Sequence, residues 1–205
     1  MFGPKVIAEY DSKYSGKLFV KSDWGNKYVT TGYLTQSGGL INDLWNPILK
    51  KLSMNHELKT MNCLILGLAT GTVAKIINKK FKNAEMVGVE IDPVMIDIGK
   101  KYFDLDKIKN LKILNLDAKR YTLNAKEQFD LILVDLYLGD QPPGFLYSPK
   151  FLKELKKLGK LVIINHLFYD EDKKKAAQEL ITSLNKHFQN IKLNHVLTNL
   201  MIICS

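Results

Sequence analysis

Residues 62–72 are Asn-Cys-Leu-Ile-Leu-Gly-Leu-Ala-Thr-Gly-Thr, and residues 88–92 are Gly-Val-Glu-Ile-Asp. Each stretch is an apolar run that stops at small or acidic residues, which is typical of a buried parallel strand leading into a helix. Gly67 and Gly71 let the backbone turn sharply and approach a ligand. Glu90 follows Gly71 after about twenty residues, the spacing of nucleotide-binding βα units. Because a carboxylate has two acceptor oxygens and no donor, it suits the two hydroxyls of a ribose, and the pattern predicts a nucleoside pocket.

The glycine turn alone is also compatible with a well-packed βα unit that binds nothing, so the neighbouring strands decide. Residues 111–118 predict a third strand ending at Asp117, and residues 129–135 predict a fourth ending at Asp135. Four successive strands therefore end in a glycine turn or an acid. Since open α/β sheets bind ligands at the carboxyl ends of their parallel strands, we expect these residues to share one site.

Composition indicates one globular unit. The chain has 205 residues, of which 46% are hydrophobic, enough for one sizeable core with a small appendage. We find no apolar run long enough to span a bilayer and no signal peptide in residues 1–10, so we expect a cytoplasmic protein with no membrane partner. Cys63 and Cys204 lie in apolar segments and are expected to be buried hydrophobic residues rather than a disulfide or metal pair. We predict no metal site.

The net charge of +9 comes from scattered lysines. A lysine-rich solvated surface is the ordinary explanation, and nucleic acid is a weakly supported alternative partner. The aromatic residues are not interleaved with the basic runs, as a stacking platform for single strands requires.

The first part of the chain differs from the rest. Residues 5–35 hold three short segments rich in β-branched and aromatic residues, separated by glycine-containing turn signals, and they predict a small antiparallel hairpin or meander. Residues 40–52 predict a helix whose apolar residues recur at helical spacing, with Trp45 as a packing residue. We therefore divide the chain into an N-terminal β extension, residues 1–38, and a Rossmann-like nucleoside-binding domain, residues 39–205.

The remaining segments alternate between helix and strand. Helices are predicted at 73–81, 93–102, 148–158 and 173–188, and further strands at 161–165, 191–196 and 200–204. Because the last two strands are joined by a tight connection, they must pair antiparallel. The predicted fold class is α/β: a doubly wound, mostly parallel sheet with a C-terminal antiparallel hairpin, the pattern of class I methyltransferase folds.

Five motifs carry a resemblance to a known family. They are Gln36-Ser-Gly-Gly, Leu66-Gly-Leu-Ala-Thr-Gly, Val89-Glu-Ile-Asp-Pro, Leu116-Asp-Ala and Asp130-Leu-Ile-Leu-Val-Asp. Together they resemble the spermidine synthase group of aminopropyltransferases, particularly its divergent spermidine-synthase-like branch, over nearly the whole chain. This group belongs to the class I superfamily of S-adenosylmethionine-dependent methyltransferases.

The resemblance implies roles for individual residues. It implies that Glu90, with Ile91 beside it, holds the ribose hydroxyls of an S-adenosyl nucleoside. It implies that Asp117 accepts from the adenine amino group and that the Ala118 backbone touches the ring. Gln36 approaches the ligand from the N-terminal side. The residues expected along the amino-acid or aminopropyl tail are Gly67, Ala69, Thr70 and Gly71. The family also suggests a homodimer.

Two departures from the family bear on the reaction. Aminopropyltransferases typically have an aspartate in the glycine turn, where this chain has Thr70, and an Asp-x-x-Asp-Pro motif after the fourth strand, where this chain has Asp135-Leu-Tyr-Leu-Gly-Asp-Gln-Pro. Burying a polyamine without paired carboxylates is costly. We therefore favour methyl transfer from S-adenosylmethionine over aminopropyl transfer from decarboxylated S-adenosylmethionine. A non-catalytic homologue that binds the nucleoside or a partner is the third hypothesis.

The acceptor is expected to be a small molecule, and an amine is one candidate. Asp135 is the candidate base or orienting carboxylate, and the alternative is a loop cap. Tyr137, Asp140 and His166 are candidate residues of the acceptor site. An exposed turn residue is the alternative for Asp140, and a structural histidine is the alternative for His166.

Overall fold

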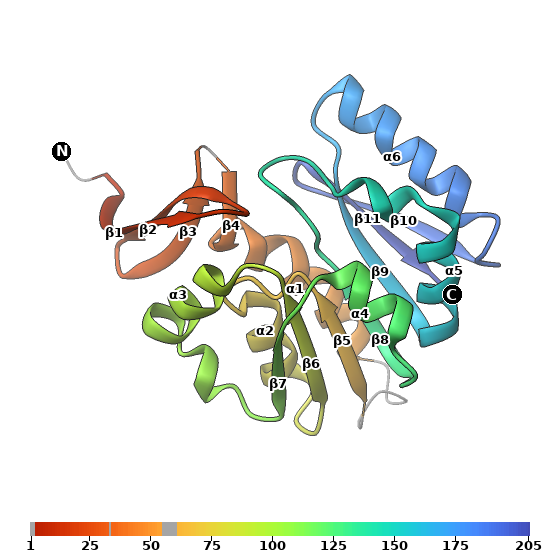
Figure 1. Ribbon diagram of the computed structural model, residues 1–205, viewed down its shortest axis with the longest axis horizontal. Coiled ribbons are helices and arrows are strands. Elements are labelled where there is room, and N and C mark those ends of the chain that lie inside the picture. Colours follow the sequence, from red (N-terminus) through yellow and green to blue (C-terminus); the bar gives the residue numbers. More distant parts are fainter. Residues whose placement is uncertain (1–2, 33, 55–60) are drawn as a thin grey trace.

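The computed structural model describes residues 3–32, 34–54 and 61–205. The chain forms two β-sheets, and helices cover both faces of the larger one (Figure 1). The strands are β1 (Lys5–Ser12), β2 (Gly16–Asp23), β3 (Asn26–Thr31), β4 (Leu34–Gly38), β5 (Asn62–Leu66), β6 (Glu85–Glu90), β7 (Leu111–Asn115), β8 (Phe129–Val134), β9 (Gly159–Leu167), β10 (Ile191–Val196) and β11 (Asn199–Cys204). The helices are α1 (Leu40–Ser53), α2 (Thr72–Lys80), α3 (Pro93–Phe103), α4 (Ala118–Asn124), α5 (Pro149–Leu158) and α6 (Glu171–Leu184), with short 3-10 turns η2 (Leu105–Lys107) and η3 (Gly144–Tyr147).

The larger sheet confirms the predicted fold class. Its seven strands run in the order β10-β11-β9-β8-β5-β6-β7. The strands from β9 to β7 pair in parallel, whereas β11 pairs antiparallel with both β9 and β10. The chain order reverses direction between β5 and β8, where an open α/β sheet has its ligand crevice.

The central strands are apolar because both of their faces are covered. Cys63, Ile65 and Leu133 face a core cluster shared with α1 and α2, while Leu64 and Ile132 face a second cluster shared with α5 and α6. Alternate side chains of a strand point to opposite faces, so each strand needs apolar residues at every position. This explains the unbroken apolar runs of the sequence.

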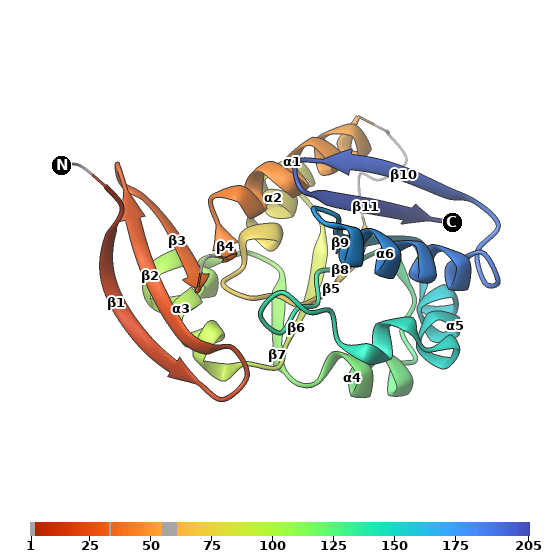
Figure 2. The same cartoon turned by 90° about the horizontal axis from the view of Figure 1, so that it is seen from above.

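The N-terminal strands form a separate antiparallel sheet in the order β1-β2-β3-β4, which Figure 2 shows beside α3. Leu18, Val20 and Val29 of this sheet pack against Met95 and Ile98 of α3. The sequence predicted three of its strands and missed β4, because Gln36-Ser-Gly-Gly has the composition of a loop. The division of the chain after residue 38 stays a prediction.

Two further elements differ from the predictions. The third strand of the larger sheet, β7, ends at Asn115 and not at Asp117, and a helix that was not predicted, α4, follows it. Asp117 is the N-cap of α4, and its side chain accepts a hydrogen bond from the Arg120 N–H. With seven residues, α4 is too short to give a clear helical periodicity. The other predicted elements are confirmed within a few residues of their predicted bounds.

Within the described residues, no helix is both long and apolar enough to cross a bilayer. The same part of the chain has no group of three or more His, Cys, Asp or Glu residues arranged to hold a metal ion.

Candidate active site

A cavity of about 400 Å³ lies at the carboxyl ends of the parallel strands. Its walls come from β4, α1, the glycine turn after β5, the ends of β6, β8 and β9, and the turn between β10 and β11. The volume is in the range of small-molecule sites. Most of the predicted site residues line it: Gln36, Gly67, Ala69, Glu90, Ile91, Asp117, Ala118, Asp135 and Tyr137. Thr70, Gly71, Asp140 and His166 do not line it.

Glu90 ends β6 with its carboxylate inside the cavity wall. One carboxylate oxygen accepts the Ala69 N–H at 2.7 Å and the other accepts the Asp92 N–H at 2.9 Å. Each oxygen keeps a lone pair for a further donor. Burial raises the pKa of Glu90 to about 7, because little solvent stabilises its charge. A ligand whose hydroxyl groups donate hydrogen bonds to Glu90 therefore replaces part of the solvation that the buried carboxylate has lost.

Asp117 and Ala118 lie at the start of α4, on the same side of the cavity as Glu90. Asp117 Oδ1 accepts the capping hydrogen bond from Arg120 N at 2.8 Å. Its Oδ2 has no hydrogen-bond partner among the described residues, so it remains available to a ligand donor. Asn115 fixes the backbone beside this group by donating to the carbonyl oxygens of Glu90 and Ile91.

The glycine turn between β5 and α2 uses both of its glycines. Gly67 has φ +88° and Gly71 has φ +91°, in the left-handed region that favours glycine. A Cβ on Gly67 would lie 2.1 Å from the Asp135 carbonyl oxygen, so the two strand ends can approach only at a glycine. A Cβ on Gly71 would meet the Leu105 side chain at 2.4 Å. Gly67 thus holds Asp135 close to the turn, and Gly71 serves packing.

Three hydroxyl groups connect the glycine turn to β4. Thr70 is fully buried, and its hydroxyl donates to Ser37 Oγ at 2.6 Å. Ser37 Oγ and Thr72 Oγ1 are 2.8 Å apart, and Thr72 Oγ1 also accepts the Gly38 N–H. Whichever of Ser37 and Thr72 donates to the other, the pair keeps one hydroxyl proton that no described residue accepts. Both residues line the cavity, at the N-terminus of α2.

Asp135 follows β8 and is held by two neutral donors. Trp45 Nε1 donates to one carboxylate oxygen at 2.8 Å, and Asn165 Nδ2 donates to the other at 2.8 Å. Asn165 Oδ1 in turn accepts from Asn199 Nδ2. Burial raises the pKa of Asp135, while these two hydrogen bonds oppose the rise. Asp135 is therefore a half-buried carboxylate in the cavity wall, held by Trp45 and Asn165.

Tyr137 has both hydrogen-bonding functions of its hydroxyl in use. It donates to the Asn165 carbonyl oxygen at 3.0 Å and accepts the Leu167 N–H at 2.8 Å. Burial and the nearby Asp135 carboxylate raise the pKa of Tyr137 well above its ordinary value. The side chain joins the loop after β8 to β9 and shapes the wall.

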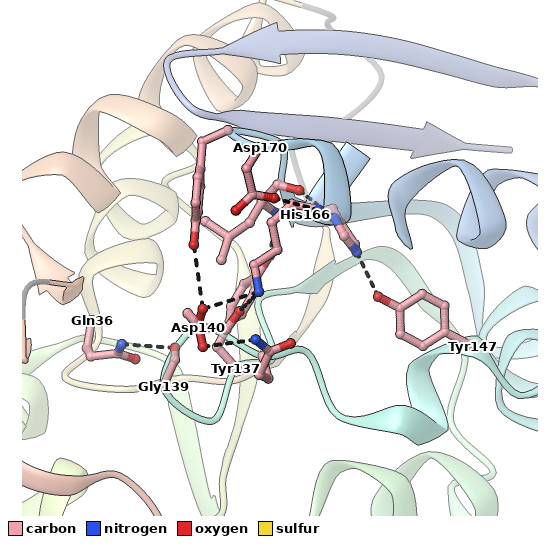
Figure 3. A network of polar contacts seen from close by, with 11 residues as sticks. Gln36, Tyr137, Gly139, Asp140, Tyr147, His166 and Asp170 are labelled. Atoms are coloured by element: carbon pink, nitrogen blue, oxygen red, sulfur yellow. Dashed lines mark hydrogen bonds and ion pairs between the residues drawn. The ribbon is translucent and has the colours of Figure 1, made fainter. Parts of the chain in front are cut away.

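Asp140 and His166 lie beside the cavity, in the network drawn in Figure 3. Asp140 Oδ2 is 3.2 Å from Lys173 Nζ of α6, which lowers the pKa of the Asp140 carboxyl. His166 is fully buried, with Nε2 2.8 Å from the Tyr147 hydroxyl and Nδ1 2.7 Å from the Leu167 carbonyl oxygen. Burial lowers the pKa of His166. The structure brings neither side chain into the cavity with Asp135.

Sequence reasoning missed several residues that organise the site. Trp45 packs in the core as predicted, but its indole N–H also holds Asp135. Asp92 caps α3, and its carboxylate also accepts from Ser12 at the end of β1 and from Ser15 of the β1–β2 turn, at 2.6 and 2.8 Å. Asn165 was predicted only as the end of a strand. No local pattern identifies these partners, because each lies at least 30 residues away from its contact in the chain.

Comparison with known proteins places the chain among S-adenosyl-dependent transferases. Residues 63–158 match the family model of a methyltransferase domain. The polyamine aminopropyltransferase of Sulfurisphaera tokodaii is 32% identical over 178 residues, which are 78% of this chain and 56% of that protein. The eEF1A lysine and N-terminal methyltransferase homolog of Drosophila melanogaster is 28% identical over 181 residues, 82% of this chain and 26% of that protein.

A solved structure agrees over almost the whole chain. A probable spermidine synthase from Corynebacterium glutamicum superposes with a TM-score of 0.81 at 14% identity, covering 98% of this chain and 80% of that one. The chain has the fold of spermidine synthases and sequence similarity to polyamine aminopropyltransferases. The resemblance stated from the motifs is thereby confirmed, as is the class I methyltransferase fold. Human methyltransferase-like protein 13 in complex with SAH also superposes, with a TM-score of 0.67 at 21% identity, covering 80% of this chain and 82% of that one.

The chain spans only part of its curated relatives: 56% of the S. tokodaii protein and 34% of a polyamine aminopropyltransferase from Vibrio vulnificus. Its own residues fit an adenosyl ligand. Glu90 and Asp117 have free acceptor positions, and the Ser37–Thr72 pair has a free donor at the other end of the glycine turn.

If Glu90 holds the ribose hydroxyls, as the family resemblance implies, its raised pKa should make nucleoside binding depend on pH. Ribose hydroxyls donate to the ionised carboxylate, so binding lowers the pKa of Glu90 from about 7. Methylthioadenosine is therefore expected to bind well at pH 8 and to lose affinity below pH 7, by up to about tenfold per pH unit. Isothermal titration calorimetry from pH 5.5 to 8.5 measures this. Glu90→Gln is the control and should bind weakly with a flat profile, whereas a flat profile in the unmodified protein would contradict the assignment.

The Trp45 hydrogen bond is expected to matter most when Asp135 is charged. Trp45→Phe removes the N–H and leaves a carboxylate oxygen without its donor, which costs about 1–3 kcal/mol of unfolding free energy. The loss should be larger at pH 8 than at acidic pH, because the pKa of Asp135 is raised and its protonation as the pH falls removes the uncompensated charge. Urea unfolding followed by circular dichroism measures both values. Leu49→Ala, a buried apolar truncation on the same helix, should cost the same at both pH values.

Proposed function

We propose that this chain binds S-adenosylmethionine and transfers the methyl group to a small-molecule acceptor. The support for the donor class comes from the cavity and from the relatives together. The methyltransferase model, the aminopropyltransferase relatives and the methyltransferase relatives all involve S-adenosyl donors, but they divide over the group transferred. The choice between the two reactions therefore rests on the tail end of the cavity.

The single observation that favours methyl transfer is the chemistry around the start of α2. Ser37 and Thr72 present a hydroxyl proton there, and the N-terminus of α2 has no acidic residue in its first turn. A hydroxyl donor and the positive end of a helix dipole suit the carboxylate of an intact amino-acid tail. Both donors carry an ammonium group, but decarboxylated S-adenosylmethionine has lost the carboxylate that this hydroxyl donor and helix N-terminus favour.

The position of Thr70 supports the same choice. In aminopropyltransferases the aspartate expected there binds the donor amine, whereas the Thr70 hydroxyl is buried and donates to Ser37. No acid lies in residues 67–72 of the glycine turn. The polyamine aminopropyltransferase of S. tokodaii, at 32% identity, keeps aminopropyl transfer as the second candidate.

We assign Asp135 as the group that takes up the proton that the heteroatom of the methyl acceptor loses. When bound, S-adenosylmethionine supplies a methyl group activated by a positively charged sulfur. The protein must orient the acceptor heteroatom and hold its proton. Asp135 is fixed by Trp45 and Asn165, lies in the cavity wall and has a raised pKa, which makes its carboxylate a stronger base than an exposed aspartate. Nucleic-acid binding and a homodimer stay predictions.

Donor binding tests this proposal directly. In calorimetry at pH 8, S-adenosylmethionine is expected to bind at least about tenfold more tightly than its decarboxylated form, because a hydrogen bond to a charged group contributes about 1.5–3 kcal/mol. Methylthioadenosine, which has neither carboxylate nor amine, serves as the reference for the nucleoside alone. A preference for the decarboxylated form would defeat methyl transfer, and no binding of any of the three would defeat both reactions.

Thr72→Val is the matching variant. It keeps the shape of the side chain but removes one hydroxyl of the pair, and it is combined with Ser37→Ala because the Ser37 hydroxyl alone could still donate. With both hydroxyls removed, the affinity for S-adenosylmethionine should fall about tenfold while the affinity for methylthioadenosine stays the same. Thr72→Ser keeps the hydroxyl and should restore most of the difference. If the double variant weakened both ligands equally, the hydroxyls would act on the fold of the turn and not on the donor tail.

A further inference from the structure

The half of the cavity that lies away from Glu90 and Asp117 is lined by residues that restrict which acceptor can bind. Glu90 and Asp117 follow β6 and β7, whereas Asp135, Asn165 and Asn199 belong to the region of β8, β9 and β11. In the sheet order these two groups of strands lie on either side of β5. If the half with Glu90 and Asp117 holds the nucleoside, the half with Asp135 faces the acceptor. The inference rests on the proposed function for this assignment.

Among the residues that the structure describes, this half has one negative charge and no positive charge. Asp135 is the one carboxylate of this half within that part of the chain, since the other described acids of the cavity wall are Glu90 and Asp117. No Lys, Arg or His is among the described residues that line the cavity. The partners of the Asp135 oxygens, Trp45 and Asn165, are neutral donors. The negative charge thus complements one positive charge of a ligand.

A second carboxylate is near in the sequence but is turned to another partner. Asp140 lies on the loop after β8, yet Lys173 Nζ contacts its carboxylate at 3.2 Å and its carbonyl oxygen at 2.9 Å. The Lys173 side chain is 8% exposed, so the pair is partly shielded from solvent. Gln36 also fixes this loop, by donating to the Gly139 carbonyl oxygen at 3.3 Å (Figure 3). Asp140 is neutralised outside the cavity and cannot pair with a second cation there.

The mouth of the cavity is apolar. Leu40 of α1, Leu138 of the loop after β8 and Leu197 of the β10–β11 turn all line the cavity and are 56%, 47% and 54% exposed. They come from three separate parts of the chain. Exposed large apolar side chains that border a pocket indicate a binding surface for an apolar group. We call Leu40, Leu138 and Leu197 the leucine rim.

We infer that the acceptor is an apolar monoamine, with its amine beside Asp135 and its hydrocarbon body against the leucine rim. A diamine or polyamine of similar length would place its second ammonium group against Leu138 or Leu197. Burying that charge without a carboxylate partner is unfavourable, whereas a methyl group at the same place gains from leaving water. The inference gives the substrate class of the acceptor half and differs from the polyamines of the aminopropyltransferase relatives.

A pair of isosteric amines tests the inference by binding alone. n-Pentylamine and putrescine have the same number of non-hydrogen atoms, and a terminal methyl group in one replaces an ammonium group in the other. With the protein saturated by methylthioadenosine at pH 8, calorimetry should give an affinity for n-pentylamine at least about tenfold higher. Equal or tighter binding of putrescine overturns the inference, and so does a failure of both amines to bind while methylthioadenosine binds.

Two aspartate variants, one at the leucine rim and one outside it, test whether the rim contacts the acceptor. Leu197 has φ +52°, a backbone conformation that aspartate tolerates better than leucine, so Leu197→Asp is expected to fold. The new carboxylate should raise the affinity for putrescine about fivefold or more and lower that for n-pentylamine. Leu193→Asp is the control, since Leu193 is similarly exposed on β10 but does not line the cavity. If Leu197→Asp leaves the ratio of the two affinities unchanged, the rim does not contact the acceptor and the inference fails.

The amine-binding test and the donor-binding test can fail independently of each other. A protein that binds methylthioadenosine and prefers n-pentylamine, but prefers decarboxylated S-adenosylmethionine, overturns methyl transfer and leaves the acceptor class intact. A protein that prefers S-adenosylmethionine but binds putrescine more tightly overturns the acceptor class alone.

Discussion

Two carboxylates at the ends of β6 and β8, the strands on either side of β5, constrain the structure around the site. Glu90 and Asp135 lose their hydration on folding, which raises the pKa of each, and each needs hydrogen-bond donors in compensation. The donors to Glu90 are backbone N–H groups of the glycine turn and of residue 92. The donors to Asp135 are side chains of α1 and β9. Satisfying the two acids therefore joins elements from distant parts of the chain.

The difference between these two sets of donors matches the different tasks proposed for the acids. Backbone donors keep Glu90 in one orientation whatever side chains surround it, as the binding of an invariant ribose requires. Asp135 depends on Trp45 and Asn165, whose replacement changes both its position and its basicity. The Ser37–Thr72 hydroxyl pair at the glycine turn and the leucine rim of the acceptor half are proposed to stand where polyamine enzymes are expected to have acids. A nucleoside half that is separate from the acceptor half is compatible with relatives that are named for the transfer of different groups.

The N-terminal sheet closes the cavity from the side opposite the parallel strands. Its β4 contributes Gln36 and Ser37 to the wall, and Ser12 and Ser15 reach the carboxylate of Asp92 at the start of α3. Leu18, Val20 and Val29 fix this sheet on α3 by apolar contact. The sheet therefore holds the donor and acceptor halves in register, because it contacts the glycine turn through Ser37 and the loop after β8 through Gln36.

The sequence by itself determined the larger sheet and the nucleoside residues. Apolar runs that stop at Gly67, Glu90 and Asp135 predict parallel strands, and the carboxyl ends of such strands meet at one edge, so these residues share the cavity. Only the tertiary structure decided which nearby groups take part. Trp45 joins Asp135 across 90 residues of chain, and Lys173 turns Asp140 away across 33. Such contacts have no local pattern, because they depend on which elements pack together and not on the residues beside them.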